Sequence, residues 1–341
     1  MKAAVFARHG GPDVVRIEDV PVPEPGSGEV RVRVGAAALN HLDLWVRRGL
    51  PIETPMPHIG GADVAGEVDA VGPGVDPIWV GARVAVDPSL DYAWYEQGSG
   101  SGAQPEKRFR LLGEHTQGGF AECCLVPAAN LVSLPDGVAF ETAAAAGLVA
   151  VTAWHGLVTR ARVKPGETVL VTGASGGVAT MAIQVARLLG ARVLAVTSGP
   201  ANAMRARELG ADIVYDRLEV DWARAAWSDT GRRGVDVVLD SVGQALWAAN
   251  LRSLAPRGRL VSYGATSGRA GDTDITLLFW KQLSILGTTM GSPEEFRTVM
   301  AHVFAGRLSP VIQELLPLAE ARRAHELLEA GRVFGKLVLK P

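Results

Sequence analysis

The chain has 341 residues, 48% of them hydrophobic, and a formal net charge of −2. These values are typical of a globular protein long enough to form two domains. A balance so close to neutral excludes the basic field that nucleic acid or an acidic membrane surface requires.

The cysteines and the apolar runs predict the compartment. The two cysteines, Cys123 and Cys124, are adjacent; in a strand they would point to opposite faces, so we expect no disulfide between them. The first residues lack the apolar segment of a signal peptide, and the longest apolar stretch, residues 143–153, is too short to span a bilayer. We therefore expect a cytoplasmic protein whose partners include neither a membrane nor nucleic acid.

Residues 1–135 predict short strands separated by Gly and Pro. Apolar and polar residues alternate in 30–34, 67–71 and 83–86, as they do in strands with one buried face. We expect this half to be a β-rich domain, folded as a partly open barrel.

Residues 90–113 interrupt this pattern. They contain the run GSGSG at 98–102 and a charged run at 106–108. Such a composition indicates a partly flexible surface lobe.

The most informative motif in the second half of the chain is a glycine-rich turn between a strand and a helix. Residues 169–171 are an apolar run, and Gly173, Gly176 and Gly177 precede a helical pattern. This is the context of the dinucleotide fingerprint, whose glycines let a pyrophosphate approach the backbone while free N–H groups at the helix start hold its charge. Ala179 replaces the third glycine. A strand, turn and helix of another kind of α/β protein is the alternative.

Apolar strands and helical segments alternate from about residue 143. The predicted strands are 169–171, 194–196, 235–239, 260–263 and 284–286. This alternation predicts a doubly wound parallel sheet with helices on both faces and right-handed connections. Helices at 294–305 and 318–329 and a strand at 336–340 follow, and we expect this end of the chain to return to the first domain.

A set of motifs shares its order and spacing with one known family. The motifs are ALNHLDLWVRRG (38–49), GADVAGEVDAVGPGV (61–75), GEHTQGGFAE (113–122), VTAWHGL (151–157), VLVTGASGGVA (169–179) and GRVFGKLVL near the end. Together they resemble the medium-chain dehydrogenase/reductase superfamily. The resemblance implies a catalytic β-barrel domain similar to the chaperonin-10 fold, over 1–145 with 289–341, and a Rossmann domain over 146–288. It also implies a nicotinamide cofactor in the cleft between them.

The resemblance further implies that zinc has been lost. The positions that match the catalytic zinc ligands are Asn40, Ala62 and Leu148. Alanine and leucine have no donor atom for zinc, and an amide is a poor ligand. Leu42 stands where alcohol-oxidising relatives have a hydroxyl that relays a proton. The positions that match the four cysteines of a second zinc site are Tyr92, Tyr95, Gly98 and Glu106.

What remains resembles the zinc-free quinone oxidoreductase branch, with its Asn-x-x-Asp signature at Asn40 and Asp43. Those enzymes transfer hydride from a reduced nicotinamide to a carbonyl-conjugated double bond or a quinone. This chemistry needs orientation and polarisation of the carbonyl rather than a metal. Trp45 stands where that branch often has a tyrosine, and it has no acidic hydroxyl to donate.

The resemblance implies a candidate catalytic group. Its members are Asn40, Asp43, Trp45, Asp63 and Thr152. Asn40 is expected to hydrogen-bond a substrate carbonyl, with a structural amide paired to the backbone as the alternative. Asp43 is expected to orient its neighbours, and Asp63 to form a salt bridge or to supply a proton. Thr152 is expected to pack beside the nicotinamide ring.

Other polar residues receive weaker assignments. His41 matches a position that approaches the cofactor pyrophosphate, and a solvent-facing histidine is the alternative. His58 and His115 have no partners at metal-ligand spacing and receive no role. Arg47 and Arg48 predict a solvated helix face.

The resemblance also implies a cofactor site. Its residues are His41, Thr152, Gly173, Ser175, Gly176, Gly177, Val178, Thr197, Ser198, Asn202, Arg217, Val242, Gly264, Ala265, Thr288 and Met290. Residues 196–200 contain no carboxylate, although an NAD site usually has one at the end of the second strand. Ser198 and Arg217 instead supply a hydroxyl and a charge for a 2′-phosphate. We expect NADPH to bind better than NADH, a preference that Asn202 weakens because relatives often have lysine there.

The leading hypothesis is therefore an NADPH-dependent, zinc-independent reductase that transfers hydride to an activated alkene or a quinone. One alternative is an unusual oxidoreductase of a biosynthetic pathway with a reshaped pocket; another is a nucleotide-binding protein without turnover. We also expect a homodimer joined edge to edge through residues 284–286, because an exposed apolar edge invites pairing. Trp280, beside that strand, is expected to serve packing rather than chemistry.

Overall fold

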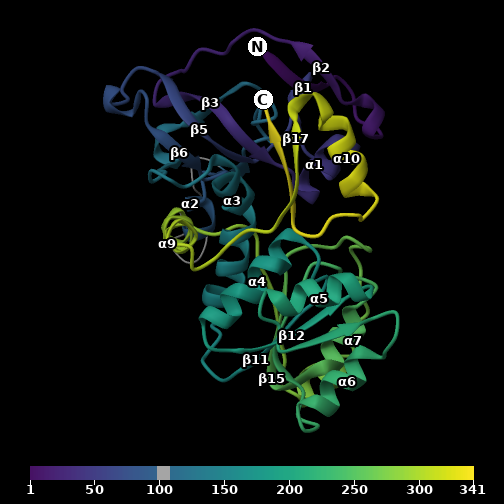
Figure 1. Ribbon diagram of the computed structural model, residues 1–341. Helices are drawn as coiled ribbons and strands as arrows, with labels where there is room; N and C mark the ends of the chain where they lie inside the picture. Colours follow the sequence, from purple (N-terminus) through teal and green to yellow (C-terminus); the bar gives the residue numbers. More distant parts are fainter. Residues whose placement is uncertain (98–107) are drawn as a thin grey trace. The chain divides into compact units, whose positions relative to one another are not determined.

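The computed structural model describes residues 1–97 and 108–341, which divide into two units (Figure 1). The first unit comprises Met1–Val151 and Gly291–Pro341, and the second comprises Thr152–Met290. Both ends of the chain thus belong to the first unit. The glycine–serine run at 98–102 lies outside the described residues, as does most of the charged run after it.

A seven-stranded sheet forms the centre of the first unit, in the order β10-β6-β5-β3-β18-β17, with β9 also paired to β3. Its strands are β3 (Glu29–Ala38), β5 (Asp63–Val71), β6 (Arg83–Val86), β9 (Cys123–Pro127), β10 (Leu131–Ser133), β17 (Ile312–Pro317) and β18 (Lys336–Lys340). Val30, Val32 and Val34 are buried, which confirms the predicted alternation in β3. Cys123 is half-buried, Cys124 is buried and both are free, as expected for neighbours on opposite faces of β9.

Smaller elements complete the first unit. The remaining strands are β1 (Lys2–Phe6), β2 (Arg16–Asp19), β4 (His58–Ile59), β7 (Ser89–Leu90) and β8 (Arg110–Leu111). The helices are α1 (His41–Arg48), α2 (Ala93–Gln97), α9 (Pro293–Phe304) and α10 (Ala321–Glu329), together with most of α3 (Phe140–Trp154). α1 and α10 lie side by side (Figure 1), so the first and last helices of the chain pack together.

The lobe expected at residues 90–113 is more regular in its described part than the sequence indicates. β7 pairs with β8, and Tyr92, Tyr95 and Phe109 form an aromatic cluster whose ring centroids lie 5.0 to 5.9 Å apart. Two of the positions matched to the second zinc site are therefore part of an apolar cluster. The other two, Gly98 and Glu106, lie outside the described residues.

A six-stranded parallel sheet forms the second unit, in the order β13-β12-β11-β14-β15-β16. Its strands are β11 (Thr168–Val171), β12 (Arg192–Thr197), β13 (Ile213–Asp216), β14 (Val235–Asp240), β15 (Leu254–Ser262) and β16 (Ser284–Gly287). The order is doubly wound, and the expected fold class is confirmed. β13 is a short edge strand that the sequence pattern did not predict.

Helices surround this sheet (Figure 1). They are α4 (Gly177–Leu188), α5 (Pro200–Glu208), α6 (Trp222–Asp229), α7 (Trp247–Ser253) and α8 (Ile275–Trp280). All of β11 is buried, as predicted for a strand covered on both faces. β16 is an edge of the sheet, and Trp280 beside it is 81% exposed. Within the single chain its ring meets that of Phe279, and the expected role of Trp280 in packing stays a prediction.

The apolar helix over residues 140–160 is longer than expected, because α3 continues into a π-helical segment, His155–Arg160. Its 21 residues have the length and hydropathy of a membrane span, which the apolar stretch 143–153 alone does not reach. However, 67% of its apolar window is buried inside the protein, which makes it a core helix.

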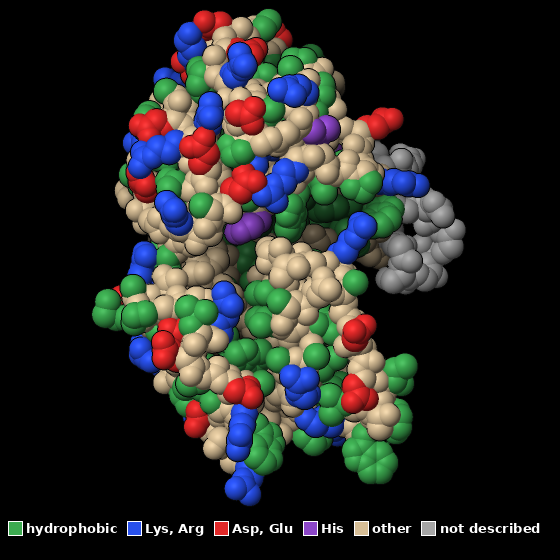
Figure 2. All heavy atoms as spheres, turned by 90° about the vertical axis from the view of Figure 1, so that its right-hand side faces the viewer, with side chains coloured by type: hydrophobic (Ala, Val, Ile, Leu, Met, Phe, Trp, Pro, Cys, Tyr) green, Lys and Arg blue, Asp and Glu red, His purple; other side chains and the backbone are tan. Residues whose placement is uncertain are grey.

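Acidic and basic side chains are interspersed on the face that Figure 2 presents. Such mixing cancels long-range fields. The charge distribution on this face thus agrees with the near-neutral net charge.

Candidate active site

The expected cofactor residues of the second unit gather where its parallel strands end. Gly173 follows β11 with φ +58°, and a Cβ there would lie 3.3 Å from Val242, which follows β14. A Cβ on Gly264, after β15, would lie 3.1 Å from Ser241. The amide of Thr288, after β16, donates to Ser262 over 3.0 Å. The carboxyl ends of a doubly wound sheet are its usual ligand site.

The turn from β11 into α4 fits a pyrophosphate. α4 begins after the N-cap Gly176, which has no side chain to accept hydrogen bonds from the first-turn amides. A Cβ on Gly176 would approach only the carbonyl of Gly173, at 3.5 Å, so space remains beside the turn. Amides at a helix start bind phosphate oxygens through hydrogen bonds and the helix dipole. This turn therefore has the donors that a dinucleotide needs.

Ser198 and Arg217 meet at the end of β12. Nε of Arg217 donates to Oγ of Ser198 over 2.6 Å, and Nδ2 of Asn202 donates to the Ser198 carbonyl over 3.0 Å. The hydroxyls of Thr197 and Thr288 are buried without a partner among the described residues. A buried hydroxyl without a partner is costly, so both positions fit a site that receives a polar ligand.

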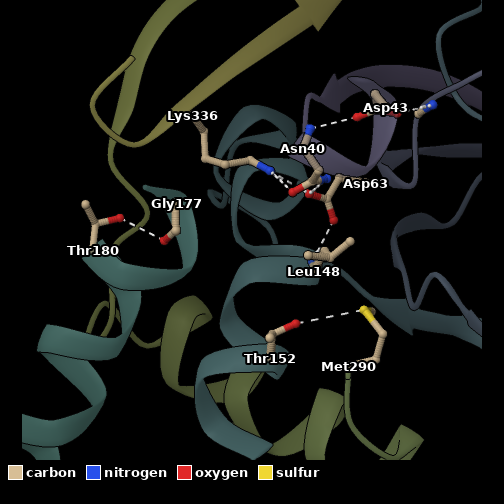
Figure 3. Close-up of polar contacts among 10 residues, drawn as sticks. Asn40, Asp43, Asp63, Leu148, Thr152, Gly177, Thr180, Met290 and Lys336 are labelled. Carbon is tan, nitrogen blue, oxygen red and sulfur yellow. Dashed lines mark hydrogen bonds and ion pairs between the residues drawn. The ribbon is translucent and has the colours of Figure 1, made fainter. Parts of the chain in front are cut away.

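Thr152 and Met290 come together at the start and end of the second unit (Figure 3). Oγ1 of Thr152 lies 3.9 Å from Sδ of Met290, and both residues are buried. Met290 has φ +51°, a conformation that is uncommon for a residue other than glycine. The expected roles of both beside the nicotinamide stay predictions.

A buried polar network joins three elements of the first unit (Figure 3). Asn40 precedes α1, Asp63 begins β5 and Lys336 begins β18. Nζ of Lys336 donates to Oδ1 of Asn40 over 2.5 Å and to Oδ2 of Asp63 over 2.9 Å. Nδ2 of Asn40 donates to the same Asp63 oxygen over 2.9 Å. Asn40 is thus held by two charged side chains, and it also forms a capping box with Asp43 at the start of α1.

The backbone of α3 completes the surroundings of Asp63. The amide of Leu148 donates to Oδ1 of Asp63 over 2.6 Å, and a Cβ on Gly147 would lie 2.6 Å from the same oxygen. Glycine at position 147 therefore lets the helix approach the carboxylate. Asp63 is 0% exposed and Lys336 is 3% exposed. A buried charge persists when it is paired and hydrogen-bonded in this way.

Asp43 ties the start of α1 to the loop before β5. Its Oδ2 accepts from the amide of Asn40 over 2.7 Å and its Oδ1 accepts from the amide of Gly61 over 3.0 Å. Burial raises the pKa of Asp43 to about 6, against the effect of these hydrogen bonds. The geometry agrees with an orienting role for this carboxyl.

The residues at the matched zinc positions do not fit the metal. Asn40 points its oxygen at an ammonium, Ala62 and Leu148 have no donor atom, and zinc prefers cysteine, histidine and carboxylate ligands. In residues 1–97 and 108–341, no group of three or more such side chains is placed to hold a metal. The absence of zinc itself stays a prediction.

The other candidate residues of α1 differ in their exposure to solvent. Arg48 and His41 are exposed, and Leu42 and Trp45 are half-buried. Arg47 is 0% exposed, and its Nη2 pairs with Glu329 of α10 over 2.7 Å. The predicted solvated face is therefore wrong for Arg47, because α10 covers it.

The histidines without an assigned role lie near Gly113. His58 is buried in β4, with Nε2 3.0 Å from the Gly113 carbonyl. Nδ1 of His115 lies 3.5 Å from a carboxylate oxygen of Glu114. Burial, followed by the charge of Asp43, raises the pKa of Glu114 to about 7. Glu114 could not be identified from the sequence, since nothing local distinguishes it from a surface acid.

Lys336 is the principal residue that the sequence analysis missed. It is the first residue of β18, whose next three residues, Leu337 to Leu339, are all buried. A lysine at the start of a fully buried strand is unusual, and this was the available signal. Its partners lie far away in the sequence, so the pattern alone does not identify them.

Comparisons with known proteins complete the description. Residues 177–305 match the family described as zinc-binding dehydrogenase, and residues 26–136 match the alcohol dehydrogenase GroES-like domain. A quinone oxidoreductase of Pseudomonas aeruginosa is 35% identical over 100% of this chain and 99% of its own length. A 2-haloacrylate reductase of a Burkholderia species is 32% identical over 99% and 98%. A solved NAD-dependent alcohol dehydrogenase superposes with a TM-score of 0.93 at 43% identity over 100% of both chains.

Proposed function

Since the chain belongs to the medium-chain dehydrogenase/reductase superfamily of NAD(P)-dependent oxidoreductases, we propose that it uses NADPH to reduce carbonyl-conjugated alkenes or quinones without zinc. The observation that carries the proposal is the network of Asn40, Asp63 and Lys336, which offers a hydrogen-bond donor where zinc ligands are lacking. The 2-haloacrylate reductase among the relatives gives further support, because a haloacrylate is a conjugated alkene.

The cofactor would be held by the turn at Gly173 to Gly177, by Ser198 and Arg217 near the ribose, and by Thr152 and Met290 near the ring. A reduced nicotinamide supplies the hydride. The proposal requires the substrate to lie between the ring and Asn40, in the cleft expected between the units, and that cleft stays a prediction.

The task of Asn40 is to stabilise charge on the substrate. When the β-carbon of an enone gains a hydride, the electron pair of the C=C bond moves through the conjugated system to the carbonyl oxygen. Nδ2–H of Asn40 donates to that oxygen, and water then protonates the α-carbon to give the saturated ketone. Preorganised donors of this kind contribute on the order of 3 kcal/mol each to transition-state stabilisation.

Alcohol oxidation is the second candidate, because the solved NAD-dependent alcohol dehydrogenase shares 43% of its residues with this chain. That reaction needs a group that removes the hydroxyl proton and stabilises the alkoxide, which zinc does as a Lewis acid. Leu42, the match to the relay position, has no hydroxyl. This candidate is therefore less well supported. The unusual biosynthetic oxidoreductase and the binder without turnover remain alternatives.

The test measures NADPH oxidation by the EDTA-treated protein with cyclohexenone and with a benzoquinone, and NADP⁺ reduction with ethanol and benzyl alcohol. We expect turnover with the first pair. Asn40→Ala should lower kcat for cyclohexenone by roughly a hundredfold and leave the Kd for NADPH unchanged. Arg48→Ala, at an exposed position of the same helix, is the control and should retain kcat. Efficient alcohol oxidation, or an Asn40→Ala variant with full activity, would contradict the mechanism.

The preference for NADPH has its own test. Arg217 is exposed and its guanidinium contacts Ser198, so it is placed to pair with a 2′-phosphate. Arg217→Ala should weaken NADPH binding by about tenfold, the value of a charged hydrogen bond, and should leave NADH binding nearly unchanged. Tighter binding of NADH by the wild type would overturn the preference.

A further inference from the structure

We propose that Lys336 is a positioning residue of this site: its ammonium fixes the Asn40 amide so that one N–H remains directed to the substrate carbonyl oxygen. The inference rests on the proposed function and adds a residue to it. It starts from the contacts of Lys336 within the first unit (Figure 3).

The register of the sheet brings Lys336 to Asn40. β18 and β3 are antiparallel, with Val338 opposite Ala38, and the amide of Leu39 donates to the carbonyl of Leu337. One further step along this register places Lys336 opposite Asn40, two residues after β3 ends. The contact is therefore built into the pairing of two core strands and does not depend on a surface loop.

The two charged partners fix the orientation of the amide. Oδ1 of Asn40 accepts from the Lys336 ammonium, while Nδ2 donates to the Asp63 carboxylate. A flipped amide would place its NH₂ against the ammonium and its oxygen against the carboxylate, and both contacts would be repulsive. A single orientation of the amide therefore remains.

This orientation leaves one donor free. An amide nitrogen carries two hydrogens; Asp63 takes one, and the other has no partner within residues 1–97 and 108–341. Asn40 is 7% exposed, compared with 3% for Lys336 and 0% for Asp63. The amide is thus the most accessible member of the network, and the charges behind it are buried.

Because Lys336 and Asp63 carry opposite charges, the role of Lys336 is to orient the Asn40 amide. The Lys336 ammonium and the Asp63 carboxylate cancel in net charge, so the pair adds little long-range field. A donor contributes to the rate when it already points to where charge develops, and without Lys336 the amide loses the charged partner at its oxygen end. Removing Lys336 should therefore affect the reduction step more than cofactor binding.

The experiment is a double-mutant cycle with cyclohexenone and NADPH. Lys336→Met should lower kcat by about tenfold or more, a part of the loss expected for removing a donor outright, with the Kd for NADPH unchanged. Lys336→Arg, which keeps the charge, should recover part of kcat. In the Asn40→Ala background, Lys336→Met should lower kcat no further, because Lys336 then has no amide to position.

Lys340→Met is the matched control. Lys340 lies on the same strand, and its side chain is 49% exposed and pairs with Glu141 at the surface, so this variant should keep the wild-type kcat. An effect of Lys336→Met no larger than that of Lys340→Met, or effects that multiply with those of Asn40→Ala, would overturn the proposal and assign Lys336 a structural role.

Lys336→Met leaves the Asp63 carboxylate buried without its ion partner, which is destabilising. If the variant does not fold, the same cycle uses Lys336→Gln in an Asp63→Asn background, where both charges are removed together, and the same criteria apply. A wild type that does not reduce enones or quinones counts against the proposed function. An active wild type with a multiplicative cycle counts against the role of Lys336 alone.

Discussion

Glu114 makes the stability of the chain depend on pH. Burial raises its pKa from 4.5 to about 7, so between these values the folded chain holds a proton that the unfolded chain has released. Stability from this group is therefore present at low pH and lost as pH rises through that window. Across this pH range the free energy of unfolding falls by about 3 kcal/mol because of Glu114.

Glu114→Gln mimics the protonated carboxyl and should reduce this dependence. Urea unfolding at about pH 5 and about pH 8 should show a smaller loss of free energy of unfolding in the variant than in the wild type. Glu208→Gln, at an exposed position of α5, is the control and should retain the wild-type slope. Equal slopes for the wild type and Glu114→Gln would mean that Glu114 is ionised in the folded chain.

Gly147 shows how one position in a helix serves a site. Alanine normally stabilises a helix relative to glycine by about 1 kcal/mol. Here the added Cβ would lie 2.6 Å from Oδ1 of Asp63, and that carboxylate is held by hydrogen bonds from Leu148, Asn40 and Lys336. We expect Gly147→Ala to lower the free energy of unfolding by about 1–3 kcal/mol. A variant more stable than the wild type in urea would show that the carboxylate moves freely.

The β16 edge carries our proposal of a homodimer. Ile285 on β16 is 39% exposed, and Phe279 and Trp280 nearby are 60% and 81% exposed. Apolar sheet edges of this kind invite pairing with a second copy. Light scattering at micromolar concentration should give the mass of a dimer for the wild type and that of a monomer for Ile285→Lys.

Leu218→Lys controls for the added charge in this test. Leu218 is 66% exposed and follows β13, which is the opposite edge of the same sheet. This variant should remain dimeric. A monomeric wild type, or a dimer that survives Ile285→Lys, would remove the edge-to-edge arrangement.

The zinc content of the purified protein tests the prediction that the whole molecule works without zinc. The donor atoms at the matched zinc positions reduce to one amide, which already contacts the Lys336 ammonium, and Tyr92 and Tyr95 of the lobe belong to an aromatic cluster. We expect the purified protein to contain substoichiometric zinc by elemental analysis and to keep its activity after dialysis against EDTA. If the protein contains stoichiometric zinc, and EDTA removes both the zinc and the activity, the chain belongs with the metal-dependent members of its superfamily.

Whether a feature of the molecule can be predicted from the sequence depends on how close together its residues lie in the chain. The turn at Gly173 and Gly176 was readable because strand, glycines and helix are adjacent in sequence. The burial of Arg47 was not, because its partner Glu329 lies 282 residues away, and a pair of arginines at a helix end resembles a solvated face. The contact of Lys336 with Asn40 spans 296 residues, a distance over which periodicity carries no information.

The division of the chain into two units also sets the order in which a ribosome synthesises their strands. Every strand of the six-stranded sheet lies between Thr168 and Gly287, whereas β17 and β18 follow it. Domains fold as units during synthesis, so the nucleotide-binding half can close its sheet while the other half still waits for its last strands. Lys336 follows the whole six-stranded sheet in the sequence, and its synthesis completes the polar network around Asn40. The sheet that would hold the cofactor can thus form before the network that we propose acts on the substrate is complete.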